Sequence, residues 1–328
     1  MLKNAVVFSL SANQDLAKSI ADRLGVNLGQ RSVKRFPSGE ILCEPIESVR
    51  GKDVFIIQST CPPVNENLME VLIFVDALKR ASAREINLIV PYFGYARQDR
   101  KAKPRQPITS CLVANLLTTA GVDRAITVNL HASQIQGFFS CLVDDLTAVP
   151  LLGHAIMASR KSLKNIVVVS PDHGGVNRAR ILAEMFNCSL AIIDKRRKSN
   201  LEPEVMNIIG DVKGKECYMI DDMIDTGRSA IIGCKALKEA GATRVNFVSV
   251  HPVLSDPAYE LLSHHDFNQF IVTDSIPLSK RFKELGTIKV ISLAPMLAEI
   301  IKRIEENKPL SVVYETYGGP DSFNFEDK

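Results

Sequence analysis

Short apolar runs alternate with helical patterns along nearly the whole chain, and this alternation limits the possible folds more than any other feature. Runs such as AVVF, DVFIIQ, INLIVPYF and RAITVNL stand between longer segments with helical periodicity. Uninterrupted apolar strands between helices are typical of a mostly parallel sheet that helices cover on both faces. The sequence therefore predicts an α/β fold.

The order of these patterns occurs twice, which indicates a duplicated domain. NAVVFSLSANQDLAKSIADRL matches NIVVVSPDHGGVNRARILAEMF in strand, loop and helix order, and DVFIIQ…ALKRA matches ECYMID…ALKEA. Chance similarity between two βαβ units is the alternative. The length of 328 residues suits two domains. We predict an N-terminal domain at 1–150 and a C-terminal domain at 151–310, with an edge strand at 311–316 that joins the first domain and a flexible tail at 317–328.

The charge and the cysteines exclude several classes of protein. A net charge of +3 gives no global electrostatic case for binding nucleic acid or a membrane surface. No apolar run in the sequence reaches the length of a membrane span. The seven cysteines include no C-x-x-C pair, which is the pattern of reduced thiols. We therefore expect a cytoplasmic protein.

The stretch CYMIDDMIDTGRSAIIG contains the strongest chemical signal. A strand is expected to end at two acids, and a short loop leads from there into a helix. Backbone N–H groups and hydroxyls at such a turn bind phosphate, whereas carboxylates repel it. Both together fit ribose 5-phosphate, with its phosphate in the loop and its hydroxyls on the acids; a solvated acidic turn is the alternative. The expected site residues are Asp221, Asp222, Asp225, Thr226, Gly227, Arg228 and Ser229.

Two basic segments also follow predicted strands. PYFGYARQDRKAKPRQ places aromatic rings beside arginine and lysine, a composition that suits adenine and a polyphosphate. IIDKRRKSN runs from a strand directly into Lys195 and Arg197, and phosphoryl transfer needs cations of this kind. Either tract taken alone could be a solvated basic loop.

Further candidates are single residues at predicted strand ends. Asp172 follows the strand IVVVS next to two glycines, where a carboxylate can hold Mg²⁺. His131 follows AITVNL, although an isolated histidine is usually structural. The segment KRFPSGEI has the composition of a simple β-turn.

These segments, in this order, resemble the ribose-phosphate diphosphokinases, which make phosphoribosyl diphosphate from ATP and ribose 5-phosphate. GYARQDRK and HASQIQGFF are similar to segments of that family, and DTGRS resembles its phosphate loop, which type I phosphoribosyltransferases share. The resemblance extends to about Tyr314. It implies two duplicated type I phosphoribosyltransferase-like domains, each a mostly parallel sheet flanked by helices, and transfer of the diphosphoryl group of ATP to the C1 hydroxyl of ribose 5-phosphate.

The same resemblance implies roles for particular residues. Lys195 and Arg197 would be catalytic, Arg197 would also clamp substrate phosphate, and His131 and Asp172 would bind Mg²⁺. The ATP contacts would come from Phe36, Ser38, Gly39, Glu40, Arg97 and Gln98. A regulatory phosphate ion would lie at Ser48, Arg50 and Ser311. The family further implies a homo-oligomer, a hexamer, in which the segment around Phe36 reaches ATP in a neighbouring subunit.

Three departures from the family pattern leave alternatives open. Ser38 stands where many members have Asp, Arg228 interrupts the usual glycine-rich loop, and Val313 replaces a serine of the phosphate-activation region. The TGRS sequence favours a phosphoribosyltransferase that consumes phosphoribosyl diphosphate, whereas GYARQDRK opposes that function. A non-catalytic regulatory homologue is the third possibility.

Overall fold

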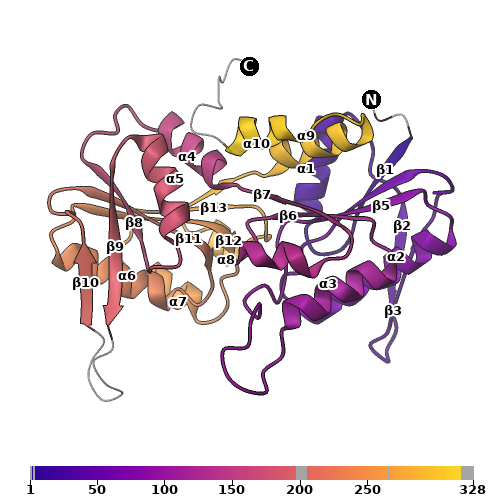
Figure 1. The fold of residues 1–328 in the computed structure, drawn as a ribbon, viewed down its shortest axis with the longest axis horizontal. Coiled ribbons are helices and arrows are strands. Elements are labelled where there is room, and N and C mark those ends of the chain that lie inside the picture. The colour runs from indigo at the N-terminus through magenta and orange to yellow at the C-terminus, as the bar shows by residue number, and fades with distance from the viewer. Residues whose placement is uncertain (1, 3, 197–204, 265, 319–328) are drawn as a thin grey trace. The chain divides into compact units, whose positions relative to one another are not determined.

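The computed structural model describes residues 2, 4–196, 205–264 and 266–318 (Figure 1). Its backbone contacts divide the chain into two compact units. Unit 1 consists of Met1–Thr147, Ser275–Pro277 and Ser292–Tyr314, and unit 2 includes Ala148–Asp274 and Leu278–Ile291. Of the helices that the structure describes, none combines the length and the apolar character that a membrane span needs.

Unit 1 contains a parallel sheet with the strand order β1-β4-β5-β6-β7. Its strands are β1 (Ala5–Ser9), β4 (Asp53–Ile57), β5 (Glu85–Val90), β6 (Arg124–Val128) and β7 (Leu142–Leu146). Every residue of β4 is buried, as expected for a central strand with both faces covered. The helical elements of this unit are α1 (Gln14–Leu24), α2 (Val64–Arg80), α3 (Thr109–Ala120), η1 (Ser133–Phe138) and α9 (Ala294–Glu305).

A separate antiparallel hairpin belongs to unit 1. It consists of β2 (Arg31–Arg35) and β3 (Ile41–Pro45), and β3 packs against α2. The tip turns at Gly39, whose φ of +91° favours glycine, and the Gly39 N–H donates to the Phe36 carbonyl at 2.9 Å. The segment KRFPSGEI is therefore a hairpin tip, in agreement with its turn composition.

Unit 2 contains a larger sheet with the order β10-β9-β8-β11-β12-β13-β14. The β10–β9 pair is antiparallel and the remaining pairs are parallel. The strands are β8 (Ile166–Ser170), β9 (Ser189–Arg196), β10 (Val205–Ile209), β11 (Glu216–Ile224), β12 (Arg244–Pro252), β13 (Gln269–Thr273) and β14 (Ile288–Ile291). The helices are α4 (Val149–Ala158), α5 (Val176–Phe186), α6 (Arg228–Glu239), α7 (Ala258–Ser263) and α8 (Lys280–Lys283).

The end of the chain differs from the sequence prediction in two ways. Residues 311–316, predicted as an edge strand, belong to the helix α10 (Ser311–Gly318), in which the buried Val313 outweighs the strand preference of its β-branched sequence. The predicted second domain, 151–310, also extends too far. Helix α9 presents an apolar stripe to α1, and this packing assigns residues 292–314 to unit 1 (Figure 1). Residues 319–328 of the predicted tail lie outside the described residues.

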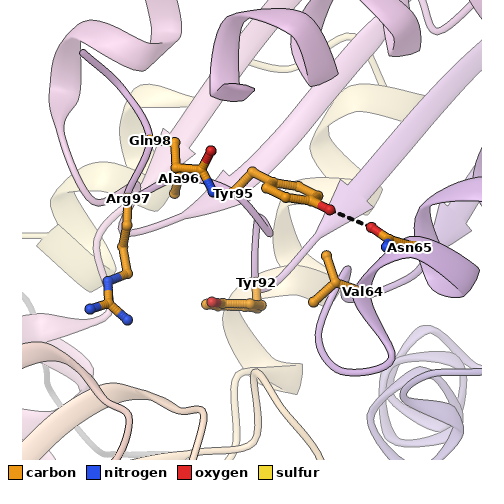
Figure 2. Close-up of a pocket in the computed structure, with 7 residues that line it drawn as sticks. All are labelled: Val64, Asn65, Tyr92, Tyr95, Ala96, Arg97 and Gln98. Carbon is orange, nitrogen blue, oxygen red and sulfur yellow. Dashed lines mark hydrogen bonds between the residues drawn. The ribbon is translucent and has the colours of Figure 1, made fainter. Parts of the chain in front are cut away.

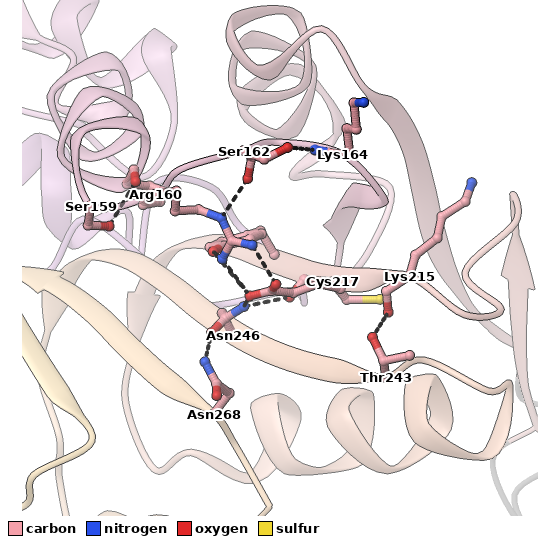
Figure 3. Close-up of polar contacts among 12 residues, drawn as sticks. Ser159, Arg160, Ser162, Lys164, Lys215, Cys217, Thr243, Asn246 and Asn268 are labelled. Atoms are coloured by element: carbon pink, nitrogen blue, oxygen red, sulfur yellow. Dashed lines mark hydrogen bonds and ion pairs between the residues drawn. The ribbon is translucent and has the colours of Figure 1, made fainter.

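A polar network fixes the amino-terminal edge of the sheet in unit 2 (Figure 3). Arg160, which follows α4, donates two hydrogen bonds to the Glu216 carboxylate at 2.7 and 2.9 Å and one to the Tyr218 hydroxyl at 2.7 Å. Asn246 also donates to Glu216, at 2.8 Å, and Asn268 donates to Asn246 at 2.7 Å. Burial alone would raise the pKa of Glu216, but these donors hold that pKa below its ordinary value. The network therefore ties β11, β12 and α4 together around an ionised carboxylate.

Candidate active site

The two adjacent acids lie inside β11 rather than at its end. Asp221 pairs with Ser249 of β12, and the pairing with β12 continues to Ile224. The pairing with β8 stops at Met219, so the strand has a neighbour on one side only where the acids lie. The expectation that the strand ends at the acids is therefore wrong, because the longer β12 keeps β11 extended. The acids still lie at the carboxyl edge of the sheet, where α/β folds bind ligands.

Arg178 of α5 lies between the two acids. Its Nη1 is 2.5 Å from Oδ1 of Asp221 and 3.5 Å from Oδ1 of Asp222. The Asp222 N–H also donates to Oδ1 of Asp221 at 2.8 Å. Burial and the neighbouring Asp222 charge raise the pKa of Asp221 to about 7, against the opposing effect of Arg178. The site thus contains two crowded carboxylates and one guanidinium.

The loop after β11 prepares the amino terminus of α6. Asp225 and Thr226 are half-buried, and Gly227, at the N-cap, has a φ of +78° and is buried against Leu262. The helix then begins with Arg228 and Ser229, both exposed, and its first turn contains no acid. Backbone N–H groups at such a terminus and the positive end of the helix dipole favour an anion. The loop therefore ends at a helix terminus that favours an anion, and phosphate binding there stays a prediction.

Asp172 is exposed in the turn between β8 and α5. Its Oδ1 accepts a hydrogen bond from the Gly175 N–H at 2.9 Å, and its carbonyl accepts one from the Ser170 hydroxyl at 2.6 Å. Next to it, His173 contacts Asp194 of β9, with Nε2 and Oδ1 3.0 Å apart. The turn therefore holds an accessible carboxylate in a fixed backbone conformation in unit 2.

A pocket of about 460 Å³ lies at the carboxyl end of β5 in unit 1 (Figure 2). The rings of Tyr92 and Tyr95 and the guanidinium of Arg97 project around one open space. Tyr95 donates a hydrogen bond from its hydroxyl to Asn65, at the start of α2. Aromatic rings beside a cation suit a purine base and its phosphates. The residues that line the pocket are Val64, Asn65, Tyr92, Tyr95, Ala96, Arg97 and Gln98.

The structure brings two family-like segments of unit 1 together at this pocket. Gln98 is held from α3, because its Oε1 accepts from the Thr109 hydroxyl at 2.5 Å and its carbonyl accepts from the Ser110 hydroxyl at 3.0 Å. The neighbouring Asp99 accepts from Gln134 of η1 at 2.7 Å. GYARQD and HASQIQ therefore contact each other, and the exposed His131 precedes η1 in the same unit.

The hairpin tip, which was predicted to contact ATP, is exposed in the single chain. The Ser38 hydroxyl donates to the Glu40 carboxylate at 2.8 Å, and Lys34 lies over the Phe36 ring, 5.0 Å from its centre. Phe36 remains 36% exposed. Contact of this tip with ATP therefore stays a prediction.

Several predicted sites remain predictions. His131 lies in unit 1 and Asp172 in unit 2, and the described residues contain no group of three or more histidine, cysteine or acidic side chains suited to a metal. The backbone of Lys195 lies in β9 opposite Met206, but its side chain and all of Arg197 fall outside the described residues. The predicted regulatory-phosphate residues, Ser48, Arg50 and Ser311, are exposed residues of unit 1.

Arg178 is the residue that sequence reasoning missed. It was one arginine in the pattern NRAR, and its 43-residue separation from Asp221 concealed the contact. A signal was nevertheless present, because the first turn of the helix after β8 faces the same sheet edge as the end of β11. A cation there was a reasonable partner for adjacent acids.

Comparisons with known proteins agree on one family. Residues 5–121 match the N-terminal domain of ribose phosphate pyrophosphokinase, and residues 198–315 match the phosphoribosyl synthetase-associated domain. The ribose-phosphate pyrophosphokinases of Fusobacterium nucleatum and Bacillus subtilis are each 51% identical to this chain, over 95% of it and 98% of their own length. A crystal structure of phosphoribosylpyrophosphate synthetase from Mycobacterium smegmatis has a TM-score of 0.88 and 42% identity, and it covers 93% of this chain and 100% of that one.

Proposed function

The chain belongs to the ribose-phosphate pyrophosphokinase family, and from this premise we propose which of its residues carry out the family's reaction. The reaction transfers the diphosphoryl group of ATP to the C1 hydroxyl of ribose 5-phosphate for nucleotide biosynthesis. The C1 oxygen bonds to the β-phosphorus, the bond from that phosphorus to the α–β bridging oxygen breaks, and AMP leaves. The product is 5-phosphoribosyl 1-diphosphate.

Unit 2 binds ribose 5-phosphate in this proposal. The 5-phosphate accepts hydrogen bonds from the amino terminus of α6 and from the hydroxyls of Thr226 and Ser229, next to the glycine turn at Gly227. The ribose hydroxyls donate to Asp221, with Asp222 beside it. The acids and the phosphate loop then serve opposite ends of one substrate, so the repulsion between carboxylate and phosphate is reduced by distance.

Unit 1 binds ATP in this proposal. The adenine packs between apolar and aromatic groups of the pocket, near Tyr92 and Tyr95, and Arg97 and Gln98 contact the nucleotide from the same rim (Figure 2). The hydrogen bonds from Thr109 and Ser110 fix the segment that contains Gln98, so these contacts require little reordering on binding.

Lys195 and Arg197 supply positive charge to the transferring diphosphoryl group. Charge accumulates on the phosphoryl oxygens during transfer, and fixed cations that face those oxygens lower the barrier. Arg197 also clamps the substrate phosphate. Lys195 follows Asp194, which His173 contacts, so the strand that carries this lysine is anchored close to the turn of Asp172.

Mg²⁺ is the metal in this proposal, with Asp172 and His131 as the residues of this chain that would hold it. Asp172 offers an exposed carboxylate, and His131 an exposed imidazole, and Mg²⁺ characteristically combines one or two carboxylates with substrate phosphates and water. When bound with the nucleotide, the ion would supply charge neutralisation at the diphosphate oxygens. Gly175 holds the Asp172 carboxylate by its backbone N–H and so orients the oxygen donors of this chain.

The assembly and its regulation form the last part of the proposal. The exposed hairpin tip, with Phe36, Ser38, Gly39 and Glu40, reaches the nucleotide of a neighbouring copy in a homohexamer. A phosphate ion at Ser48, Arg50 and Ser311 activates the enzyme allosterically. Sedimentation of the purified protein, and its turnover with and without inorganic phosphate, would test these two statements separately.

The observation that carries the function is the full-length match to relatives of one name, at 51% identity over 95% of the chain. Neither of the rival functions has comparable support. The test is to incubate the protein with ATP, Mg²⁺, inorganic phosphate and ribose 5-phosphate, and to follow AMP by chromatography. We expect AMP and 5-phosphoribosyl 1-diphosphate in equal amounts. Absence of AMP under these conditions would overturn the proposal.

A further inference from the structure

The two acids proposed to bind ribose, Asp221 and Asp222, both contact the guanidinium of Arg178, a residue to which the proposed reaction assigns no role. Arg178 is 19% exposed and forms the shortest contact of the cluster, 2.5 Å to Asp221. Gly175 lies directly beside its guanidinium, because a Cβ at that glycine would be 3.4 Å from Nη1 of Arg178. The guanidinium is thus enclosed between the turn before α5 and the two carboxylates of β11.

The hydrogen bonds to Asp221 restrict its carboxylate strongly. Both Nη1 of Arg178 and the Asp222 N–H donate to the same oxygen, Oδ1, at 2.5 and 2.8 Å. Two donors on one oxygen fix the rotation of the carboxylate. The Asp221 side chain is 25% exposed, whereas that of Asp222 is 6% exposed. Asp221 is therefore the acid that a ligand can reach, in an orientation that Arg178 sets.

The net charge of the acidic cluster is a second argument for the importance of Arg178. Asp221, Asp222 and Asp225 would together place three negative charges within a few residues of the loop that binds a phosphate dianion. One guanidinium in contact with two of them offsets one charge without occupying the loop. Its bonds are to carboxylates at the ligand-binding edge of the sheet, at the end opposite to the Arg160 network of the same strand.

We propose that Arg178 is a positioning residue that holds Asp221 in the orientation that recognises the ribose hydroxyls and that makes the acid pair compatible with the adjacent phosphate loop. The inference rests on the proposed function and deepens it. It names the residue through which this site distinguishes ribose 5-phosphate from a sugar phosphate that lacks a hydroxyl. Arg178 acts through Asp221 and does not contact the reacting atoms.

The test compares Arg178→Met and Arg178→Lys with Arg180→Gln, a control on the same helix whose arginine is exposed. Calorimetry without ATP gives the Kd of each protein for ribose 5-phosphate and for 2-deoxyribose 5-phosphate. For Arg178→Met we expect the Kd for ribose 5-phosphate to rise about 10- to 100-fold, the effect of one charged hydrogen bond. We expect the preference for ribose over deoxyribose to fall by about the same factor, and Arg178→Lys to restore part of it.

Arg180→Gln should retain both the affinity and the preference of the wild-type protein. The KM for ATP should stay within about twofold in every variant, because the change is confined to the sugar site.

An unchanged preference for ribose over deoxyribose in Arg178→Met would overturn the inference, as would an equal loss of that preference in Arg180→Gln. If Arg178→Met does not fold, Arg178→Lys decides, since a purely structural ion pair predicts no change in its sugar preference. Lack of AMP formation by the wild-type enzyme refutes the proposed function instead, and these binding measurements do not need turnover.

Discussion

Strand β4 of unit 1 and strand β11 of unit 2 occupy equivalent positions in the two duplicated domains. The polar groups at the carboxyl ends of these two strands are nevertheless used differently. In unit 1, Gln58 accepts a hydrogen bond from the Ala12 N–H at 2.9 Å and donates to the Asn67 carbonyl. Thr60 accepts from the Gly94 N–H at 2.6 Å and donates to the Tyr92 carbonyl at 3.1 Å. These side chains are buried, and their bonds hold unit 1 together.

In unit 2 the corresponding residues remain available to a ligand. Asp221 stands where unit 1 has Gln58, and Asp221 is raised in pKa and partly exposed, whereas Gln58 is neutral and buried. The loop of unit 2 leads through Gly227 to an open helix terminus, whereas α2 of unit 1 follows Pro63, which has no N–H to offer. Unit 1 instead keeps its pocket one strand away, at the end of β5.

At the amino-terminal edge, in contrast, the two sheets have the same kind of contact. Strand β4 begins with Asp53, which Arg84 binds with two hydrogen bonds, and β11 begins with Glu216, which Arg160 binds in the same manner. An acid held by a guanidinium thus starts the same strand in both copies. The comparison teaches that the amino edge serves stability in both units, whereas at the carboxyl edge Gln58 of unit 1 is fully buried and Asp221 of unit 2 stays partly exposed. The following experiments test this difference, starting with the largest expected effect.

The largest difference should come from two lysines within strands, Lys195 of β9 in unit 2 and Lys34 of β2 in unit 1. Lys195→Ala in unit 2 should lower turnover by about 10²- to 10³-fold, because it removes a cation from the transferring group. The Kd for ribose 5-phosphate should change little. Lys34→Ala in unit 1 removes only the cation over the Phe36 ring, and we expect a higher KM for ATP at nearly unchanged turnover. Steady-state kinetics separate these outcomes, and near-normal turnover in Lys195→Ala would contradict the assigned role.

Asp221→Gln converts the acid of unit 2 to its unit 1 counterpart. Replacing the charged acceptor by a neutral amide should raise the Kd for ribose 5-phosphate by about 10- to 100-fold. Burial and the Asp222 charge raise the pKa of Asp221 to about 7, so the proton that stabilises the folded state is present at low pH and is lost as pH rises through that value. The stability gained by the variant should therefore be larger at pH 8 than at pH 5, by about 1 kcal/mol or more. Equal effects at both pH values would show that Asp221 is ionised throughout.

Removal of one hydroxyl from each loop should separate binding from stability. Thr226→Val in unit 2 should raise the KM for ribose 5-phosphate about tenfold and leave the free energy of unfolding nearly unchanged. Thr60→Val in unit 1 leaves the buried Gly94 N–H without its acceptor, so it should cost about 1–3 kcal/mol of stability. The KM of the Thr60→Val variant for ribose 5-phosphate should stay unchanged. Denaturant unfolding gives the stability of both variants, and steady-state kinetics give their KM values. A loss of stability in Thr226→Val would contradict the proposed difference between the two loops.

The smallest effect concerns Arg228. A cation in the first turn of α6 opposes the helix dipole, at a cost of about 0.3–1 kcal/mol, unless an anion is bound there. Arg228→Ala should therefore raise the thermal midpoint of the free protein slightly and raise the KM for ribose 5-phosphate by a few-fold. The added stabilisation by ribose 5-phosphate should shrink in the same variant. A lower midpoint without ligand would mean that Arg228 has a structural role instead.

Much of the fold was predictable because its strands are uninterrupted apolar runs. Burial on both faces favours this arrangement for segments such as IVVVS, and the loop proposed to bind phosphate stood out because Thr, Gly and Ser follow such a strand. The two mostly parallel sheets with flanking helices confirm the predicted class. The helix at 311–318 was not predictable, because the sequence SVVYETY favours a strand locally, whereas the burial of Val313 in the fold favours a helix.

The site was predictable by residue type but not by geometry. The carboxylates of Asp221 and Asp222 were identified, whereas their guanidinium partner was not, because Arg178 reaches them only once α5 packs beside β11. Arg97 and Gln98 were expected near ATP, and they line a pocket whose other wall, Asn65, comes from α2. Contacts of this kind depend on which elements are neighbours in the fold, and a single sequence contains little information about that.

Hydrogen exchange of the wild-type protein with and without ribose 5-phosphate tests the central claim most directly, namely that only unit 2 kept its carboxyl edge open for the sugar phosphate. The two loops provide an internal control for each other in one experiment. We predict that exchange slows about tenfold or more at the amides of 225–231 when the ligand binds, while the amides of 58–66 do not change. Protection of 58–66, or of both loops equally, would contradict the claim.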